Sequence, residues 1–302
     1  SLNTLFIEQI SRASAAQRAG RAGRTAPGVC IRLWDRKEHE KRPAREEPEV
    51  LRLDLAEAVL TLKAAGSGDL RKFRWLDAPE EKSLARSEEL LLDLGALQSP
   101  ADITPLGRRM LAFPIHPRYS RMLLAASELG CVRQAALAAA LTQGRDILVR
   151  RPDSGAAEFR DDVLGDRDSS DFWILMRAWE FAAENRFRLD PCRRAGIHAQ
   201  AARQAGPAFD LFLNIARREG LDTADRDAPE EALRKCLLIG FPDRVARRID
   251  AGTLRCELVH GRRGVLARES AVRRATLFVA AEVREVEGKD RGLSTILSLA
   301  TA

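Results

Sequence analysis

Apolar residues recur every three or four positions along much of the chain, which is the spacing of one buried helix face. Between residues 104 and 240 this pattern is bounded by typical start and stop residues, such as Pro after a capping Thr and Gly after the last apolar position. The spacing predicts helices over 105–112, 117–129, 132–142, 171–184, 197–205, 208–219 and 230–239. We therefore expect a helical bundle in this part of the chain.

Further elements precede that bundle. Apolar positions predict helices over 51–65 and 84–94, each followed by a glycine. A short polar hairpin is expected at 98–102, and two helices before a hairpin suggest a winged-helix unit. Upstream, alternating apolar and polar residues predict a strand over 29–34, and the charge-dense stretch 35–49 is expected to be an exposed connection.

The pattern changes after residue 241. Alternating or β-branched residues separated by turns predict strands over 253–260, 264–267 and 275–285. The string HGRRG at 260–264 is typical of a tight hairpin. The sequence therefore predicts a mainly α-helical protein with smaller α/β and β parts, the last part being a small β domain.

Composition narrows the class of protein. Of the 302 residues 45% are hydrophobic and 31% charged, which excludes collagen-like and most disordered chains. No apolar run approaches the ~20 residues of a membrane span, and no signal-peptide pattern opens the chain, so we expect no membrane partner. The five cysteines form no CxxC and the histidines no HExxH, which favours free thiols in a reducing cytoplasm and no metal site.

Arginine dominates the charge. The net charge is +6, and 43 of the 50 basic residues are arginine. A planar guanidinium binds phosphate with two parallel hydrogen bonds, so a nucleic-acid partner is compatible with this bias. Arginine on solvated helix faces explains the same bias, so the charge leaves both interpretations open.

The most specific string in the chain is QRAGRAGR at 17–24. Its arginines, Arg18, Arg21 and Arg24, recur every third residue with Gly or Ala between them. On a helix this spacing drifts slowly around one face, so the guanidinium groups converge, and the small residues leave room for a ligand. Converging guanidinium groups suit a polyanion such as a nucleoside triphosphate, because arginine neutralises charge that develops on the γ-phosphate during phosphoryl transfer.

This string resembles motif VI of superfamily 2 helicases, in particular the DEAH-box RNA helicases. Other strings are also similar to that family and stand in the order in which the family has them. They are SRASAA at 11–16, just before the motif, and PGVCIRLW at 27–34, LLDLGAL at 91–97, ITPLG at 103–107 and FPIHPR at 113–118 after it. Two strings, WLDAP at 75–79 and FPDRVARR at 241–248, are similar to the bacterial HrpB-type branch.

The resemblance implies four parts: the end of a RecA-like lobe over 1–40, a winged helix over 41–103, a helical ratchet domain over 104–240 and a truncated OB-like β domain over 241–302. In such helicases the motif VI glutamine places the attacking water or the γ-phosphate, which implies this role for Gln17. Two arginines contact that phosphate, here Arg21 and Arg24, whereas Arg18 anchors the motif in its own domain. The implied cofactors are ATP and Mg²⁺, and the implied partner is single-stranded nucleic acid, in particular RNA.

The chain departs from the family in two motifs. It contains no GxxxxGK(S/T) and no DExH, and its one Gly-Lys pair, Gly288-Lys289, lies in a late polar turn. The phosphate cradle and the carboxylate that holds Mg²⁺ are therefore absent from this sequence. We expect a C-terminal fragment of an ATP-dependent RNA helicase that hydrolyses no ATP alone. The start without Met, inside an apolar segment at 2–10, favours the same view.

Weaker candidates complete the sequence-based predictions. Arg262 and Arg263, at the predicted hairpin tip, are candidate contacts for nucleic-acid phosphates, although a merely soluble turn has the same composition. The four tryptophans are expected to pack in cores. His116 has no acidic residue spaced for acid–base catalysis, so we expect it to be structural.

Two other functions stay open. One is a nucleic-acid-binding or adaptor module that kept the accessory domains and lost the motor, and the other is part of a DNA-directed superfamily 2 helicase. An upstream reading frame with both missing motifs favours a helicase. A comparison of RNA-stimulated with DNA-stimulated ATP hydrolysis separates the two helicases.

Overall fold

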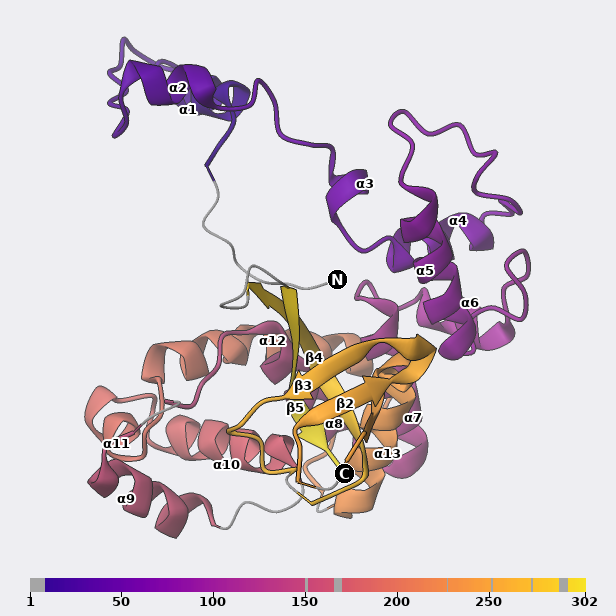
Figure 1. Ribbon diagram of the computed structural model, residues 1–302, viewed down its shortest axis with the longest axis vertical. Coiled ribbons are helices and arrows are strands. Elements are labelled where there is room, and N and C mark those ends of the chain that lie inside the picture. Colours follow the sequence, from indigo (N-terminus) through magenta and orange to yellow (C-terminus); the bar gives the residue numbers. More distant parts are fainter. Residues whose placement is uncertain are drawn as a thin grey trace.

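The computed structural model describes residues 9–149, 152–165, 170–226, 228–250, 252–272, 274–287 and 293–302. Helices α1 to α13 come first in the chain and strands β1 to β5 last (Figure 1). The expected mainly helical class with a small β part is confirmed. The apolar start at 2–8 and the Gly288-Lys289 turn lie outside the described residues. In the part that is described, no helix combines the length and apolar character needed to cross a bilayer.

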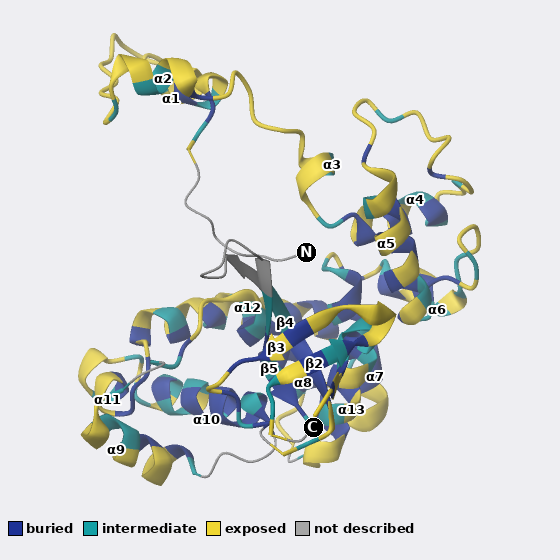
Figure 2. Ribbon diagram, viewed as in Figure 1, coloured by how far each residue is buried: buried dark blue, intermediate teal, exposed yellow. Residues whose placement is uncertain are grey.

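Helices α1 (Arg12–Ala22) and α2 (Arg36–Lys41) stand apart from the other elements (Figure 1) and are largely exposed (Figure 2). The strand expected over 29–34 is wrong, because no described strand lies beside this segment to complete a ladder. Its alternating apolar side chains, Val29, Ile31 and Leu33, are 81–93% exposed.

The stretch 35–49, expected to be a connection, contains α2. Asp35 caps this helix by accepting a hydrogen bond from the Glu38 amide at 2.6 Å. The exposed pair Arg36–Glu40, one turn apart at 3.2 Å, supports it further. Caps and charge pairs rather than apolar spacing therefore form this helix.

The second group contains α3 (Glu49–Arg52), α4 (Ala56–Ala64), α5 (Glu81–Asp93) and α6 (Pro105–Met110). The single helix expected over 51–65 is wrong. The Asp54 carboxylate accepts a hydrogen bond from the Ala56 amide at 2.8 Å, which starts α4 as a new helix. The expected hairpin is confirmed by an antiparallel bridge between Leu97 and Ile103.

A buried ion pair lies inside this group. The Nζ atom of Lys63 in α4 is 3.1 Å from Oε1 of Glu88 in α5, and the two side chains are 1% and 6% exposed. Arg71 donates to the other Glu88 oxygen at 3.1 Å, and Lys63 also donates to the Gly68 backbone oxygen. Both charges therefore have the partners that make their burial tolerable.

The third group supplies most of the largest core, which also includes residues of the second group. Its helices are α7 (Pro117–Leu129), α8 (Val132–Gln143), α9 (Ser154–Leu164), α10 (Asp171–Glu184), α11 (Leu189–Arg194), α12 (Ala199–Arg218) and α13 (Glu230–Gly240). The predicted α7, α8, α10 and α13 are confirmed to within one residue at each end. Helices α9 and α11 were not predicted, because α9 is mostly polar and α11 is only six residues long.

The two helices expected over 197–205 and 208–219 are one helix, α12, with Pro207 inside it. A proline in a helix interior removes one backbone hydrogen bond and costs ~3 kcal/mol. Pro207 is exposed, whereas Phe209 and Phe212 on the same helix are buried. Burial of this continuous apolar face offsets the loss at the proline.

The strands β1 (Val245–Arg248), β2 (Arg255–Leu258), β3 (Arg263–Leu266), β4 (Leu277–Glu287) and β5 (Leu293–Thr301) form a closed barrel in the order β1-β2-β3-β5-β4. Only β3 and β5 pair in parallel among these strands. The barrel is OB-like, with a small core around Phe278 and Leu297. The predicted β2, β3 and β4 are confirmed. β1 and β5 were not predicted, because neither shows a long alternation between turns.

Candidate functional site

The segment 17–24 begins inside α1 and runs past its end. Gln17 and Arg21 are four residues apart, so they lie on the same face of the helix. Arg24 follows the capping residue Gly23, so the expectation that all three arginines lie on one helix is wrong for Arg24. Glycine at the cap contributes to this early end, since glycine is ~1 kcal/mol less favourable than alanine within a helix.

The polar side chains of this segment form no hydrogen bond or ion pair within the part of the chain that the structure describes. Gln17, Arg18, Arg21 and Arg24 are all exposed. A Cβ atom added at Gly20 or Gly23 meets nothing within 4 Å. No neighbour in the described chain therefore requires these glycines. Together the residues form an open surface with long hydrogen-bond donors and bare backbone, suited to a phosphate-bearing ligand.

Arg42 fixes α1 against the segment that follows it. Its guanidinium lies 4.1 Å from the centre of the Trp34 ring, donates to the Ile10 backbone oxygen at 3.1 Å, and donates to Glu38 at 2.6 Å. Arg42 is only 8% exposed, so this contact is the small core of the α1–α2 unit. Trp34 therefore has a packing role, as expected.

The other tryptophans also have packing roles. The indole N–H of Trp75 donates to the Leu70 backbone oxygen at 2.9 Å, and that of Trp179 donates to Ala202 at 3.0 Å. Trp173 is 9% exposed.

The two arginines of the β2–β3 hairpin differ. Arg262 turns back toward the 3₁₀ turn Pro242–Arg244, where its guanidinium donates to the Asp243 backbone oxygen at 3.1 Å. Arg263 is exposed at the start of β3. Of this pair, Arg263 is therefore the side chain more available to a phosphate.

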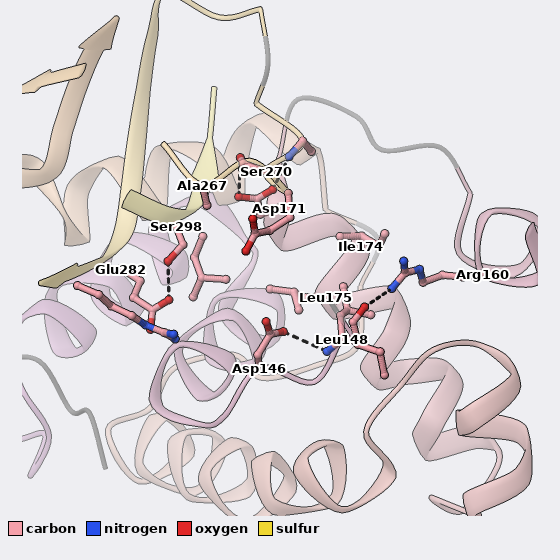
Figure 3. Close-up of a pocket in the computed structure, with 15 residues that line it drawn as sticks. Asp146, Leu148, Arg160, Asp171, Ile174, Leu175, Ala267, Ser270, Glu282 and Ser298 are labelled. Carbon is pink, nitrogen blue, oxygen red and sulfur yellow. Dashed lines mark hydrogen bonds and ion pairs between the residues drawn. The ribbon is translucent and has the colours of Figure 1, made fainter. Parts of the chain in front are cut away.

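A pocket of about 100 Å³ lies between α10 and the barrel (Figure 3). The Asp171 carboxylate, at the start of α10, accepts hydrogen bonds from the Ser270 hydroxyl at 2.8 Å and from the backbone amides of Ala271 and Ala300 at 2.7 and 2.8 Å. Across the pocket Glu282 accepts from the Ser298 hydroxyl at 2.6 Å. The Asp171 contacts therefore join the barrel to α10, whereas the Glu282–Ser298 bond links β4 and β5 within the barrel.

No described group of three or more His, Cys, Asp or Glu side chains is arranged to hold a metal ion.

Two family profiles match adjacent parts of the chain. Residues 87–115 match the winged-helix part of the helicase associated domain (HA2), and residues 116–199 match its ratchet-like part. The first match covers most of α5, the Leu97–Ile103 bridge and α6. The second begins at His116, the N-cap of α7.

Helicases of known sequence and structure are similar to the chain. It is 31% identical over 248 residues to the ATP-dependent RNA helicase HrpA of Escherichia coli, which covers 78% of this chain and 19% of HrpA. It is 27% identical over 256 residues to the probable ATP-dependent RNA helicase DHX35 of Pongo abelii, over 84% of this chain and 36% of that protein. The crystal structure of the E. coli DExH-box NTPase HrpB superposes with a TM-score of 0.59 at 25% identity, covering 98% of this chain and 30% of HrpB.

The chain belongs to the DEAH-box RNA helicase family. It contains the C-terminal region of such a helicase, with the HA2 winged helix, the ratchet-like domain and an OB-like barrel, and it spans between a fifth and about a third of these relatives.

His116 lies at the junction of the two HA2 parts of this DEAH-box chain. Its Nδ1 atom accepts a hydrogen bond from the Arg118 amide at 3.2 Å and caps α7, and its Nε2 atom is 3.4 Å from Asp54 Oδ2. Burial lowers the pKa of His116, even though the Asp54 carboxylate favours the charged ring. No spacing in the sequence pairs Asp54 with His116, because 62 residues separate them. The neutral, capping imidazole supports the expected structural role.

The FPDR string of this DEAH-box chain, at 241–244, joins its ratchet-like domain to its barrel. Arg118 in α7 donates to both oxygens of the Asp243 carboxylate, at 2.5 and 2.8 Å, and to the Gly240 backbone oxygen at 3.3 Å. Burial alone raises the pKa of Asp243, but the Arg118 guanidinium outweighs it and holds that pKa below its usual range. The FPDR string, which is similar to the HrpB-type branch, therefore also has a structural role, because it connects the ratchet-like helices to the barrel.

Proposed function

We propose that this chain is part of an ATP-dependent RNA helicase in which Gln17, Arg21 and Arg24 face the γ-phosphate of ATP. The observation that carries the proposal is the surface at 17–24, where exposed donors flank glycines that no described neighbour requires. An arginine that neutralises charge on the γ-phosphate is worth ~10³–10⁵ in rate. The helicase names of the relatives support the class of enzyme.

ATP and Mg²⁺ are the cofactors of this proposal. The chain contributes one wall of the nucleotide cleft: Gln17 orients the attacking water, and Arg21 and Arg24 donate to phosphate oxygens. The phosphate cradle and the Mg²⁺ ligands belong to another part of the full-length protein, since this sequence contains neither motif. Magnesium supplies charge neutralisation between the phosphates when it is bound.

The proposed partner is single-stranded RNA, and the proposed compartment is the cytoplasm. In the barrel the aromatic ring of Phe278 is buried, which favours contact with backbone phosphates over base stacking there. Arg263 is the exposed candidate for such a contact, and Arg262, also held by Asp243, is the second.

The test uses the full-length protein with Arg21→Ala and Arg24→Ala. We expect RNA-stimulated ATP hydrolysis to fall by a factor of ~10³ or more in each variant, with RNA binding largely retained. Arg36→Ala, which removes an exposed arginine of α2, is the matched control and should keep the wild-type rate. Near wild-type turnover in both variants would overturn the site assignment.

Two controls separate this proposal from its alternatives. The isolated 302-residue chain is expected to hydrolyse no ATP, and robust nucleotide turnover by it would contradict the division of the cleft proposed above. A full-length protein that binds RNA without hydrolysing ATP would favour the adaptor module. Stronger stimulation by DNA than by RNA would favour the DNA-directed helicase.

A further inference from the structure

The tip of the β2–β3 hairpin reaches across to the winged helix (Figure 1). His260 and Gly261 at this tip both have positive φ, +63° and +72°. A side-chain-bearing residue such as histidine rarely adopts this conformation, and it persists only where surrounding contacts hold it. Here those contacts place the imidazole of His260 against α5.

The imidazole lies between two carboxylates of α5. Its Nδ1 atom is 3.2 Å from Oε1 of Glu89, and its Nε2 atom is 3.1 Å from Oδ2 of Asp93. A neutral imidazole has one N–H and one lone pair, so it donates to only one carboxylate and turns its lone pair toward the other. Only the imidazolium donates to both. Both hydrogen bonds therefore form only when the ring is protonated.

His116 shows the opposite arrangement in the same chain. Its Nδ1 atom accepts a hydrogen bond from a backbone amide and needs its lone pair, so the neutral ring fits there. The two histidines thus respond differently to a proton: protonation breaks the cap at His116 and completes the contact at His260.

We propose that His260 is a protonation-gated clasp between the barrel and the winged helix. The imidazolium closes the contact by donating to Glu89 and Asp93. Loss of the proton removes one of the two hydrogen bonds and sets a lone pair against a carboxylate, which releases the hairpin from α5. The contact joins parts of the chain itself, so its test is independent of ATP and RNA.

Charged groups on three elements surround His260. Glu89 and Asp93 lie on α5, Asp243 and Arg244 on the 3₁₀ turn, and Arg262 and Arg263 on the hairpin. Arg118 and Arg262 bind Asp243, and Arg244 donates to the Ala281 backbone oxygen. Carboxylates and guanidinium groups in such pairs keep their charge between about pH 5 and 8, whereas histidine changes its charge there.

The other attachments of the barrel do not open with the clasp. The Arg118–Asp243 pair and the three hydrogen bonds to Asp171 hold the barrel on the ratchet-like helices. The winged helix stays on the ratchet as well, because α6 packs against α7 and both parts share one core, so release of His260 opens the contact of the hairpin alone. The motion separates α5 from the hairpin tip.

Distance measurements between spin labels test the clasp. Labels are attached at Arg86→Cys on α5 and Arg255→Cys on β2, both exposed, in a Cys30→Ser background; the other four cysteines are buried. In the labelled chain we expect one short distance at about pH 5.5 and at least a threefold smaller population of it at about pH 8.5.

Three variants complete the test. His260→Asn tolerates positive φ and has no charge, so it should show the open distribution at both pH values. His260→Lys keeps a positive charge and should stay closed at both. Glu89→Gln with Asp93→Asn keeps the histidine and should lose the pH dependence. A distribution in the wild-type side-chain background that does not change with pH, or a pH dependence that persists in His260→Asn, would overturn the proposal.

Discussion

Arg118 and Asp243 form a two-point ion pair between residues 125 positions apart, and their side chains are only 7% and 14% exposed. The pair sits where the ratchet-like bundle meets the barrel. The Arg118 guanidinium also lies 5.4 Å from the centre of the Phe241 ring, at cation–π distance. One side chain therefore contacts both the carboxylate and the aromatic ring of the FPDR string. The two domains are therefore expected to unfold together.

Arg118→Ala should lower the free energy of unfolding by ~3–5 kcal/mol, because it leaves the Asp243 carboxylate nearly buried without its main partner. Urea unfolding of the chain measures this change. Arg262→Ala removes a half-exposed partner of the same carboxylate, at 3.6 Å, and should cost less than ~1 kcal/mol. Equally small decreases in the free energy of unfolding of both variants would contradict the proposed role of the Arg118–Asp243 pair.

Glu88→Ala should destabilise the winged helix by ~3–5 kcal/mol, since Lys63 would keep a charge in a site that is 1% exposed without an anion beside it. Glu81, which is 81% exposed and 3.5 Å from Arg71, provides the control. Its replacement by alanine should change stability by less than ~1 kcal/mol. Thermal unfolding measures the stability of both variants. A decrease in Glu88→Ala no larger than that in Glu81→Ala would contradict this prediction.

His116→Ala should cost ~1 kcal/mol through loss of the α7 cap. His116→Asn should retain most of that stability, because asparagine also accepts a hydrogen bond at an N-cap. Chemical unfolding of the three proteins at neutral pH makes the comparison. Equal losses in the two variants would show that packing against Asp54, rather than the cap, is what His116 provides.

Stability should also depend on pH through His116. Because burial lowers its pKa in the folded chain below the ordinary 6.5, the unfolded chain binds the proton more readily. Its contribution is therefore fully present above about pH 6.5 and decreases as the pH falls below that value. Unfolding followed from pH 7.5 downward should show a shallower loss in His116→Asn, and an unchanged slope would refute this origin.

Gly20→Ala tests whether the surface at 17–24 needs a glycine for ATP hydrolysis rather than for the stability of α1. The new Cβ meets nothing within 4 Å, so α1 should gain ~0.5–1 kcal/mol, measurable as increased helicity of the chain. If ATP approaches the backbone there, the full-length variant should nevertheless lose ATP turnover. Gly28→Ala offers a contrast, because its Cβ would lie 1.9 Å from the Ala22 oxygen and should disturb the fold itself.

Local features decided which elements could be predicted. Pro117 at the first turn and Gly130 with φ +71° bound α7, and both are visible in the sequence. The single helix α12 was not predicted, because Pro207 normally ends a helix and only the tertiary packing of Phe209 overrides it. The strand predicted over 29–34 does not form, because the alternation of apolar and polar residues is present but no described strand pairs with this segment.

The candidate sites also differ in how far the sequence predicts them. Gln17, Arg21 and Arg24 stand in one short string, so residue order was enough to single them out, although their contact with a nucleotide stays a proposal. The His260 contacts depend on a residue of the barrel meeting α5, 167 positions away from Asp93. No spacing in the sequence carries that information, because it arises from how three domains fold back on one another.

Helices α7 and α13 pack side by side, and Cys236 of α13 brings its sulfur within 3.5 Å of the sulfur of Cys131, the residue that precedes α8, 105 positions earlier. A nascent chain therefore exposes the apolar face of α7 to solvent until α13 has been synthesised. Such long-range closure slows folding and prolongs the time in which other nascent chains can stick to that face. Yield of this protein should therefore depend on chaperones that shield α7 during translation more than on the stability of the finished bundle.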